Sequence, residues 1–278
     1  MDRTKIEWCD STWNPVTGCL HECEYCYARR IAERFSGYEN GDYSFTRSNY
    51  AKTGDVLFEI SEECPPINKR FDNKKQQMVF SVAPYPFGFS PTFHRNRLTQ
   101  LKRWKKSRVI FVCSMADLFG EWVPVEWITD IFNACKENPQ HTYLFLTKNP
   151  RRYIKLAEKG LLPEDSNMWF GSTANTPDTP YFFDSTRNTF VSIEPILAEF
   201  ITGGENYGHN VNWVIVGAET GNRKDKVVPE KSWVEAIIRD CSERGIPLLM
   251  KDSMIPVVGE ENMVRQLPFP ENKQEKTE

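Results

Sequence analysis

The chain has 278 residues, 40% of them hydrophobic, which is enough to bury a full core. Single α/β barrels commonly run to about 250 residues, so we expect one main domain. The formal net charge of -3 argues against a protein that coats nucleic acid through its overall charge, although a local basic groove remains compatible with it. The chain has neither a run of the roughly 20 apolar residues that a membrane span needs nor an apolar leader, which predicts a cytoplasmic protein without a membrane partner.

The first predicted elements are a strand over Thr12–Thr17 and a helix over Tyr27–Phe35. Between them, Cys19, Cys23 and Cys26 stand at C-x3-C-x2-C spacing. The sequence therefore predicts a strand that leads into a cysteine loop, followed by a helix.

The stretch from Gly37 to Pro91 interrupts this pattern. It is rich in glycine and proline and holds only short apolar runs, such as Val56–Ile60 and Met78–Val82. We expect an insertion or lid over residues 37–91, because it offers few long periodic segments from which an independent core could be built.

A basic stretch follows between residues 95 and 108. Leu98, Leu101 and Trp104 recur there at intervals compatible with an amphipathic helix. The cations are Arg95, Arg97, Lys102, Arg103, Lys105, Lys106 and Arg108. Most such runs are solvated helix faces, but clustered cations also suit phosphate and aromatic side chains can stack on bases. Contact with a nucleic acid is therefore retained as a hypothesis.

From residue 109 onward, short apolar runs alternate with helical patterns. The predicted strands are Val109–Cys113, Thr142–Leu146, Met168–Gly171, Thr189–Ile193, Trp213–Val216 and Pro247–Met250. The predicted helices are Val125–Lys136, Tyr153–Lys159 and Ser232–Glu243, the last with Ser232 as its cap and Gly245 at its end. Such alternation predicts a parallel sheet covered by helices. The barrel domain is expected over residues 1–270, with a disordered polar tail over 271–278.

The remaining cysteines do not form a disulfide framework, because the chain is large and has no export signal. Cys113, Cys135 and Cys241 lie in apolar or periodic stretches. We interpret these three as ordinary buried residues, since free cysteine packs as a small hydrophobe.

Three thiolates suit a 4Fe-4S cluster that keeps one iron open to a small molecule, whereas four protein ligands would favour simple electron transfer. Structural zinc is the rival interpretation, and it normally takes four protein ligands, with Cys9 or His21 as a possible fourth. The other cysteines do not include a second C-x2-C pair, and this weakens the zinc interpretation. A redox-active Cys23-x-x-Cys26 pair is a further alternative, but it leaves Cys19 without a role.

The spacing, with Tyr25 just before the third cysteine, resembles the radical S-adenosylmethionine superfamily. That resemblance implies a partial, open TIM-like α/β barrel whose cysteine loop follows the first strand. It also implies a 4Fe-4S cluster and S-adenosylmethionine as cofactors, with Cys19, Cys23 and Cys26 as the metal ligands. Reductive cleavage would give methionine and a 5′-deoxyadenosyl radical that abstracts hydrogen from a substrate.

More of the chain is similar to the phage Gp37/Gp68 family, also called the DUF5131 family. The similar stretches span nearly the whole chain apart from the insertion and the tail; they are residues 5–8, 12–19, 26–28, 112–119, 146–150, 191–195, 213–221 and 250–251. This narrower resemblance implies a fold and a cofactor, but it gives little information about the reaction.

Several of these stretches place polar residues just after a predicted strand, at the carboxyl end where parallel barrels gather their binding groups. Comparison with the superfamily implies cofactor contacts from Tyr25, Ser114, Asp117, Ser172, Asn175, Gly217 and Glu219. Ser114 and Asp117 stand where the superfamily usually has a Gly-Gly-Glu segment, and Gly217 would let the backbone approach the adenine. The catalytic candidates are Lys148, Glu194 and Lys251.

The sequence thus predicts a radical S-adenosylmethionine enzyme served by an electron donor such as a flavodoxin or ferredoxin. The leading substrate hypothesis is a nucleic acid or nucleotide, from the basic stretch and from a loose similarity of residues 114–117 to spore photoproduct lyase-like enzymes. The alternative is a non-catalytic iron-sulfur or zinc-binding module of a phage or defence system.

Overall fold

The computed structural model describes residues 4–37, 45–48, 56–60, 67–200, 210–221 and 223–269. The chain divides into two compact units: unit 1 comprises Met1–Ser11, Ser107–Ile110 and Gln140–Glu278, and unit 2 comprises Thr12–Lys106 and Phe111–Pro139. Cys64 and the predicted tail, residues 271–278, lie outside the described residues.

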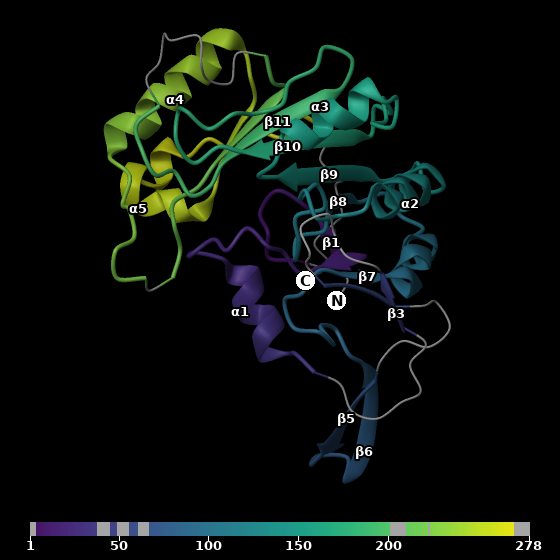
Figure 1. The fold of residues 1–278 in the computed structure, drawn as a ribbon. Coiled ribbons are helices and arrows are strands. Elements are labelled where there is room, and N and C mark those ends of the chain that lie inside the picture. Colours follow the sequence, from purple (N-terminus) through teal and green to yellow (C-terminus); the bar gives the residue numbers. More distant parts are fainter. Residues whose placement is uncertain are drawn as a thin grey trace. The chain divides into compact units, whose positions relative to one another are not determined.

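The largest sheet has seven strands whose order follows the chain (Figure 1). Its strands are β1 (Ser11–Trp13), β8 (Val109–Val112), β9 (Thr142–Thr147), β10 (Met168–Thr173), β11 (Asn188–Ile193), β12 (Trp213–Val216) and β13 (Leu248–Met250). The ladders from β9 to β13 are all parallel. A parallel sheet in sequential order that starts at β1 and ends at β13 is the arrangement of an open α/β barrel, so the predicted fold class is confirmed at that level.

Three helices lie where the periodicity predicts them: α2 (Val125–Lys136), α3 (Arg151–Glu158) and α4 (Lys231–Arg244). Helix α4 ends at Gly245, whose φ of 66° is the left-handed conformation that glycine adopts most readily. The predicted cap at Ser232 is wrong, because the helix starts one residue earlier and Glu230 holds the cap position without a side-chain bond.

Three short helical turns follow β13: η2 (Asp252–Met254), α5 (Ile255–Val258) and η3 (Glu260–Asn262). Within the described ranges, no helix is both long and apolar enough to cross a membrane.

Unit 1 buries its strands almost completely. Strand β10 is buried at every residue, and the rings of Phe145 and Phe170 stack with centroids 5.5 Å apart. A second cluster joins Val191 and Val214 of the sheet to Ile237 of α4. Strands covered on both faces read as continuous apolar runs, which is why the sequence marks them clearly.

The predicted strand over Thr12–Thr17 is split between two sheets. Its first part is β1, while β2 (Val16–Thr17) belongs to a four-stranded sheet. The order of that sheet is β2, β7 (Thr92–His94), β4 (Leu57–Ile60) and β3 (Phe45–Ser48). The break falls at Asn14-Pro15, where proline has no N-H to donate to a ladder.

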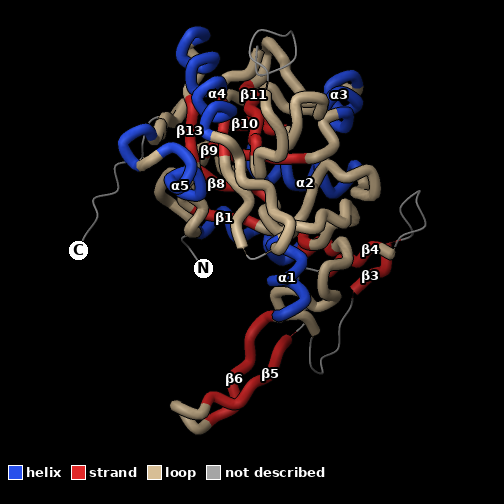
Figure 2. Tube along the Cα trace, turned by 90° about the vertical axis from the view of Figure 1, so that its left-hand side faces the viewer, coloured by secondary structure: helices blue, strands red, loops and turns tan. Residues whose placement is uncertain are grey.

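The predicted insertion contains more strand than its composition suggests. Besides β3 and β4, it holds a separate two-stranded hairpin, β5 (Ile67–Asp72) and β6 (Gln77–Val82), which both views show extending beyond helix α1 (Tyr27–Arg34) (Figures 1 and 2).

The basic stretch forms the 3-10 helix η1 (Arg95–Arg103), not the predicted amphipathic α-helix. Arg95 pairs with Glu59 and Asp130. Arg97 donates to the carbonyl oxygens of Asn14 and Pro84, and desolvation of its guanidinium lowers its pKa to about 10 although part of the side chain remains exposed. Both cations thus have partners within unit 2, which leaves fewer unpaired charges on this stretch than its sequence suggests.

Two buried serines on neighbouring strands provide a test of the packing of unit 1. The Ser172 hydroxyl accepts a hydrogen bond of 2.9 Å from the backbone N-H of Phe182, whereas the Ser192 hydroxyl has no partner among the described residues. Ser172→Ala should lower the free energy of unfolding by about 1–3 kcal/mol, because it leaves that N-H unsatisfied. Ser192→Ala should change it by less than about 0.5 kcal/mol or raise it. Urea denaturation measures both, and equal losses would contradict this account.

Candidate metal and cofactor sites

The cysteine loop begins at a position that only glycine fits. Gly18 has a φ of 87°, and a Cβ there would lie 2.3 Å from the Ser90 carbonyl oxygen. Its N-H donates to Met115 O at 2.9 Å, and the N-H of Cys19 donates to Phe89 O at 3.2 Å. The start of the loop is thus fixed between two other segments of unit 2.

The loop ends at the N-terminus of α1. Cys26 is the N-cap residue, and its sulfur accepts the backbone N-H of Arg29 at 3.4 Å. The N-H of Cys26 donates to Cys23 O at 3.1 Å. The helix dipole and the free N-H groups at this end favour negative charge on the Cys26 sulfur.

The Cys19 thiol is the most strongly perturbed of the three. Burial raises the pKa of Cys19 to about 12, and the negative charges of Asp117, Cys23 and Cys26 add to that rise, while the backbone N-H of His21 opposes it. Cys19 and Cys26 both pack against an apolar cluster that includes Met115. In the part of the chain that the structure describes, no three Cys, His, Asp or Glu side chains are placed closely enough to form a ready-made metal site.

Asp117 lies beside the loop and is bonded to His21. Its Oδ2 lies 2.7 Å from His21 Nε2, and its Oδ1 accepts the N-H of Phe119 at 3.0 Å. The carboxylate side chain is only 7% exposed, and the His21 ring meets Trp122 edge-on with centroids 4.9 Å apart. The sequence indicated both residues as candidates for different roles but gave no sign that they form a pair.

Ser114 is hydrogen-bonded to residues on both sides of the cysteine loop. Its hydroxyl donates to Asn14 Oδ1 at 3.1 Å, and the same oxygen accepts the Met115 N-H at 3.0 Å. The Tyr27 hydroxyl donates to the Ser114 carbonyl at 2.8 Å. Tyr25, the other cofactor candidate in unit 2, is partly exposed within the loop. Asn14 was missed by the sequence analysis, and its position before a proline is the only signal that could have marked it.

A second cluster lies in unit 1, where three predicted residues meet. Glu194 follows β11, Gly217 follows β12 and Lys251 follows β13. Glu194 and Lys251 form an ion pair directly over Gly217, since a Cβ at that position would lie 3.1 Å from Lys251 Cδ and 3.2 Å from Glu194 Cγ. A larger residue at position 217 would therefore have to displace this pair by a few tenths of an ångström.

Lys148 and Asn175 extend the cluster. Lys148 Nζ donates to Asn175 Oδ1 at 3.1 Å, and Asn175 Nδ2 donates at 2.6 Å to the carbonyl oxygen of Pro195, the residue after Glu194. The structure therefore gathers Lys148, Asn175, Glu194, Gly217 and Lys251 at the carboxyl ends of neighbouring parallel strands, where the sequence predicts a binding region.

Two of the predicted cofactor contacts are engaged elsewhere in unit 1. The Ser172 hydroxyl is fully buried and bonded to Phe182. Glu219 makes two hydrogen bonds with Arg223, at 2.7 and 2.8 Å, and these lower the pKa of its carboxyl group.

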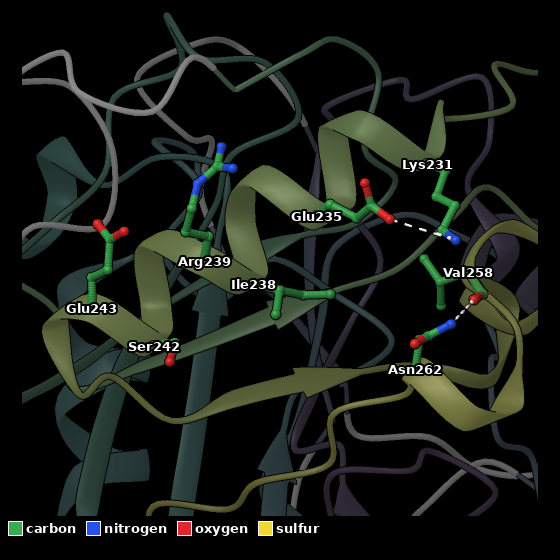
Figure 3. Close-up of a pocket in the computed structure, with 8 residues that line it drawn as sticks. All are labelled: Lys231, Glu235, Ile238, Arg239, Ser242, Glu243, Val258 and Asn262. Carbon is green, nitrogen blue, oxygen red and sulfur yellow. Dashed lines mark hydrogen bonds and ion pairs between the residues drawn. The ribbon is translucent and has the colours of Figure 1, made fainter.

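A depression along α4 lies apart from these residues (Figure 3). Lys231 and Glu235, one turn apart on α4, pair at 3.5 Å on one side of it, and Asn262 donates to the carbonyl of Val258 at 2.7 Å. None of the predicted site residues lines it.

Comparison with known families now bears on this arrangement. The model of the DUF5131 family, described as a protein of unknown function, matches residues 3–256. The chain belongs to the DUF5131 family. No curated protein and no solved structure matches this DUF5131 chain. The predicted membership is confirmed, and the family's description brings no reaction with it.

The Glu219–Arg223 pair predicts a pH dependence of stability. The folded-state pKa of Glu219 is lowered from its ordinary value of 4.5, so its contribution is complete above that value and is lost as the pH falls through the folded pKa. Glu219→Gln should reduce the melting temperature at pH 7, and the gap from the wild type should close as the pH falls below about 4.

Scanning calorimetry across this pH range is the measurement. Glu235→Gln, which breaks the exposed Lys231 pair, is the matched control and should change the melting temperature little at pH 7. If the melting temperature of Glu219→Gln stays equally far below that of the wild type in acid, the variant is destabilised by altered packing and not by loss of the ion pair.

Proposed function

We propose that this DUF5131 chain is a radical S-adenosylmethionine enzyme whose 4Fe-4S cluster is held by Cys19, Cys23 and Cys26. The observation that carries the proposal is a short loop that carries three cysteines and is fixed at both ends, by Gly18 and by the start of α1. Thiolates are the donors that iron-sulfur clusters take, and three of them leave one iron for a small molecule.

The surroundings of the loop fit such a group. Phe89 and Met115 supply apolar contacts beside the thiols, which restrict water. Backbone N-H groups of His21 and Arg29 donate to the sulfurs of Cys19 and Cys26. Hydrogen bonds to sulfur and a low exposure to solvent are two of the means by which a protein tunes a cluster.

When bound, the cluster supplies one electron to S-adenosylmethionine and breaks a carbon-sulfur bond, giving methionine and a 5′-deoxyadenosyl radical. The chain's own residues then have three tasks. Cys19, Cys23 and Cys26 bind, the Asn14 and Asp117 contacts keep the neighbouring segment in place, and the apolar wall excludes water. A flavodoxin or ferredoxin is the proposed class of electron donor.

Lys148, Glu194 and Lys251, at the strand ends of unit 1, are the proposed catalytic residues. A carboxylate and an ammonium held as a pair can accept or donate a proton, and Asn175 fixes the direction of Lys148 Nζ. Gly217 lets this pair lie close against the backbone. The proposed substrate class is a nucleic acid or nucleotide. The basic stretch in η1 gives this proposal less support than the sequence suggests, because Arg95 and Arg97 have partners within the protein.

One observation favours the second candidate, a non-catalytic metal-binding module. A histidine whose one ring nitrogen is bonded to a carboxylate commonly ligates a metal through the other, and His21 is bonded to Asp117 in this way. His21 with the three cysteines would complete a closed four-ligand zinc site.

Anaerobic reconstitution with iron and sulfide separates the two candidates. The enzyme should turn brown and, with dithionite and S-adenosylmethionine, release 5′-deoxyadenosine. Alanine at Cys19, Cys23 or Cys26 should abolish the cluster absorbance, because none of only three ligands can be spared. His21→Ala should retain the cluster.

Cys135→Ala and Cys241→Ala are matched controls, since both thiols are buried on helices α2 and α4 and should not affect iron content. A zinc module would bind no cluster, release no 5′-deoxyadenosine and lose its metal in the His21→Ala variant. That combination of results would replace the first candidate by the second.

A further inference from the structure

The β5–β6 hairpin presents its apolar face to solvent. Antiparallel pairing places Ile67 opposite Val82, Lys69 opposite Phe80 and Phe71 opposite Met78, so these six side chains share one face. All six are exposed, with Phe71 at 52% and Phe80 at 64%. On the other face, Asn68, Asp72 and Val79 are partly buried.

This is the reverse of the usual pattern, in which the apolar face of a hairpin packs on a core. The hairpin forms a two-stranded sheet of its own, and a two-stranded ribbon is at best marginally stable by itself in water. An exposed apolar face on such a ribbon marks an interaction surface.

Charge indicates which partner fits. Residues 67–82 carry four cations, Lys69, Arg70, Lys74 and Lys75, against one acid, Asp72, in a chain with a net charge of -3. Asp72 Oδ1 accepts the backbone N-H groups of Lys74 and Lys75, at 2.9 and 3.2 Å, so the acid shapes the turn. The two lysine side chains are exposed at the tip. The surface is therefore complementary to an anion.

Phe71 and Phe80 are diagonal neighbours across the two strands, and such neighbours lie about 7–8 Å apart. Sheet-borne aromatic rings at neighbouring positions stack successive bases of a single strand, while lysines beside them bind its phosphates. A membrane is a poorer occupant, because the tip, Asn73 to Gln76, is wholly polar.

We propose that the exposed face of the β5–β6 hairpin binds single-stranded nucleic acid, with bases on Phe71 and Phe80 and phosphates at Lys69, Lys74 and Lys75. This surface does not depend on the cysteine loop. It is a separate binding function of unit 2, and it stands or falls without the proposed radical chemistry.

Fluorescence anisotropy with a labelled single-stranded DNA of mixed sequence tests the proposal on the full chain, without iron or S-adenosylmethionine. Phe71→Ala and Phe80→Ala should each weaken binding about tenfold. Gln77→Ala and Ser81→Ala, on the opposite face, are the matched controls and should bind as the wild type does. Replacing Lys74 and Lys75 by glutamine should make the salt dependence shallower by about 1.4 in logarithmic slope.

Circular dichroism of each variant confirms that the chain stays folded, as expected for side chains that already face solvent. Wild-type affinity in both phenylalanine variants would overturn the proposal, as would a duplex competitor that binds as tightly as the single strand. Hairpin-dependent binding to phosphatidylserine vesicles, without oligonucleotide binding, would also overturn it and assign the face to a membrane.

Discussion

At Gly18 the backbone of unit 2 passes so close to the Ser90 carbonyl that a side chain has no room. The left-handed conformation there turns the chain, and the bonds from Gly18 and Cys19 to Met115 and Phe89 hold the turn in place. The proposed role of the cysteines depends on this constraint, because it fixes the position of Cys19 and the apolar residues that pack against it. The start of α1 does the same for Cys26 at the other end of the loop.

Each unit places its candidate residues by a different physical means. In unit 2, irregular segments are fastened by side-chain bonds to backbone groups, as Asn14 does for Met115 and Asp117 does for Phe119. In unit 1, parallel strands bring their ends together, and the polar residues after them meet as neighbours. A partly buried charge there is costly unless it is paired, which accounts for the contact between Glu194 and Lys251.

The sequence predicts the elements that carry a strong pattern. Strands β9 to β13 are nearly continuous apolar runs, and α2 and α4 show helical spacing, so their limits fall within a few residues of the prediction. Strand order brings Lys148 and Asn175 to the same edge of the sheet, but it does not predict the hydrogen bond between them. The split of β1 from β2 was not predictable in this way, because Thr12–Thr17 has the composition of one strand and only Pro15 hints at a break.

Side-chain partners that the tertiary structure brings together could not be predicted from the sequence either. Glu219 pairs with Arg223 only four residues later, whereas the Ser172 hydroxyl accepts a hydrogen bond from Phe182 across a loop. The basic residues around Arg95 and Arg97 in the sequence are typical of a solvent-exposed stretch, yet Arg95 binds a distant carboxylate and Arg97 a distant carbonyl oxygen. Of the β5–β6 hairpin, the sequence indicates only the apolar run Met78–Val82, because the strand register and the exposed face depend on the three-dimensional structure.

The central claim is that three cysteines hold a cluster with one iron left open. Electron paramagnetic resonance of the anaerobically reconstituted, dithionite-reduced protein, recorded with and without S-adenosylmethionine, tests it most directly. The account predicts the signal of a reduced 4Fe-4S cluster whose g values shift when the small molecule binds the open iron. A cluster signal that stays unchanged by S-adenosylmethionine, or no cluster signal at all in folded protein, would contradict it.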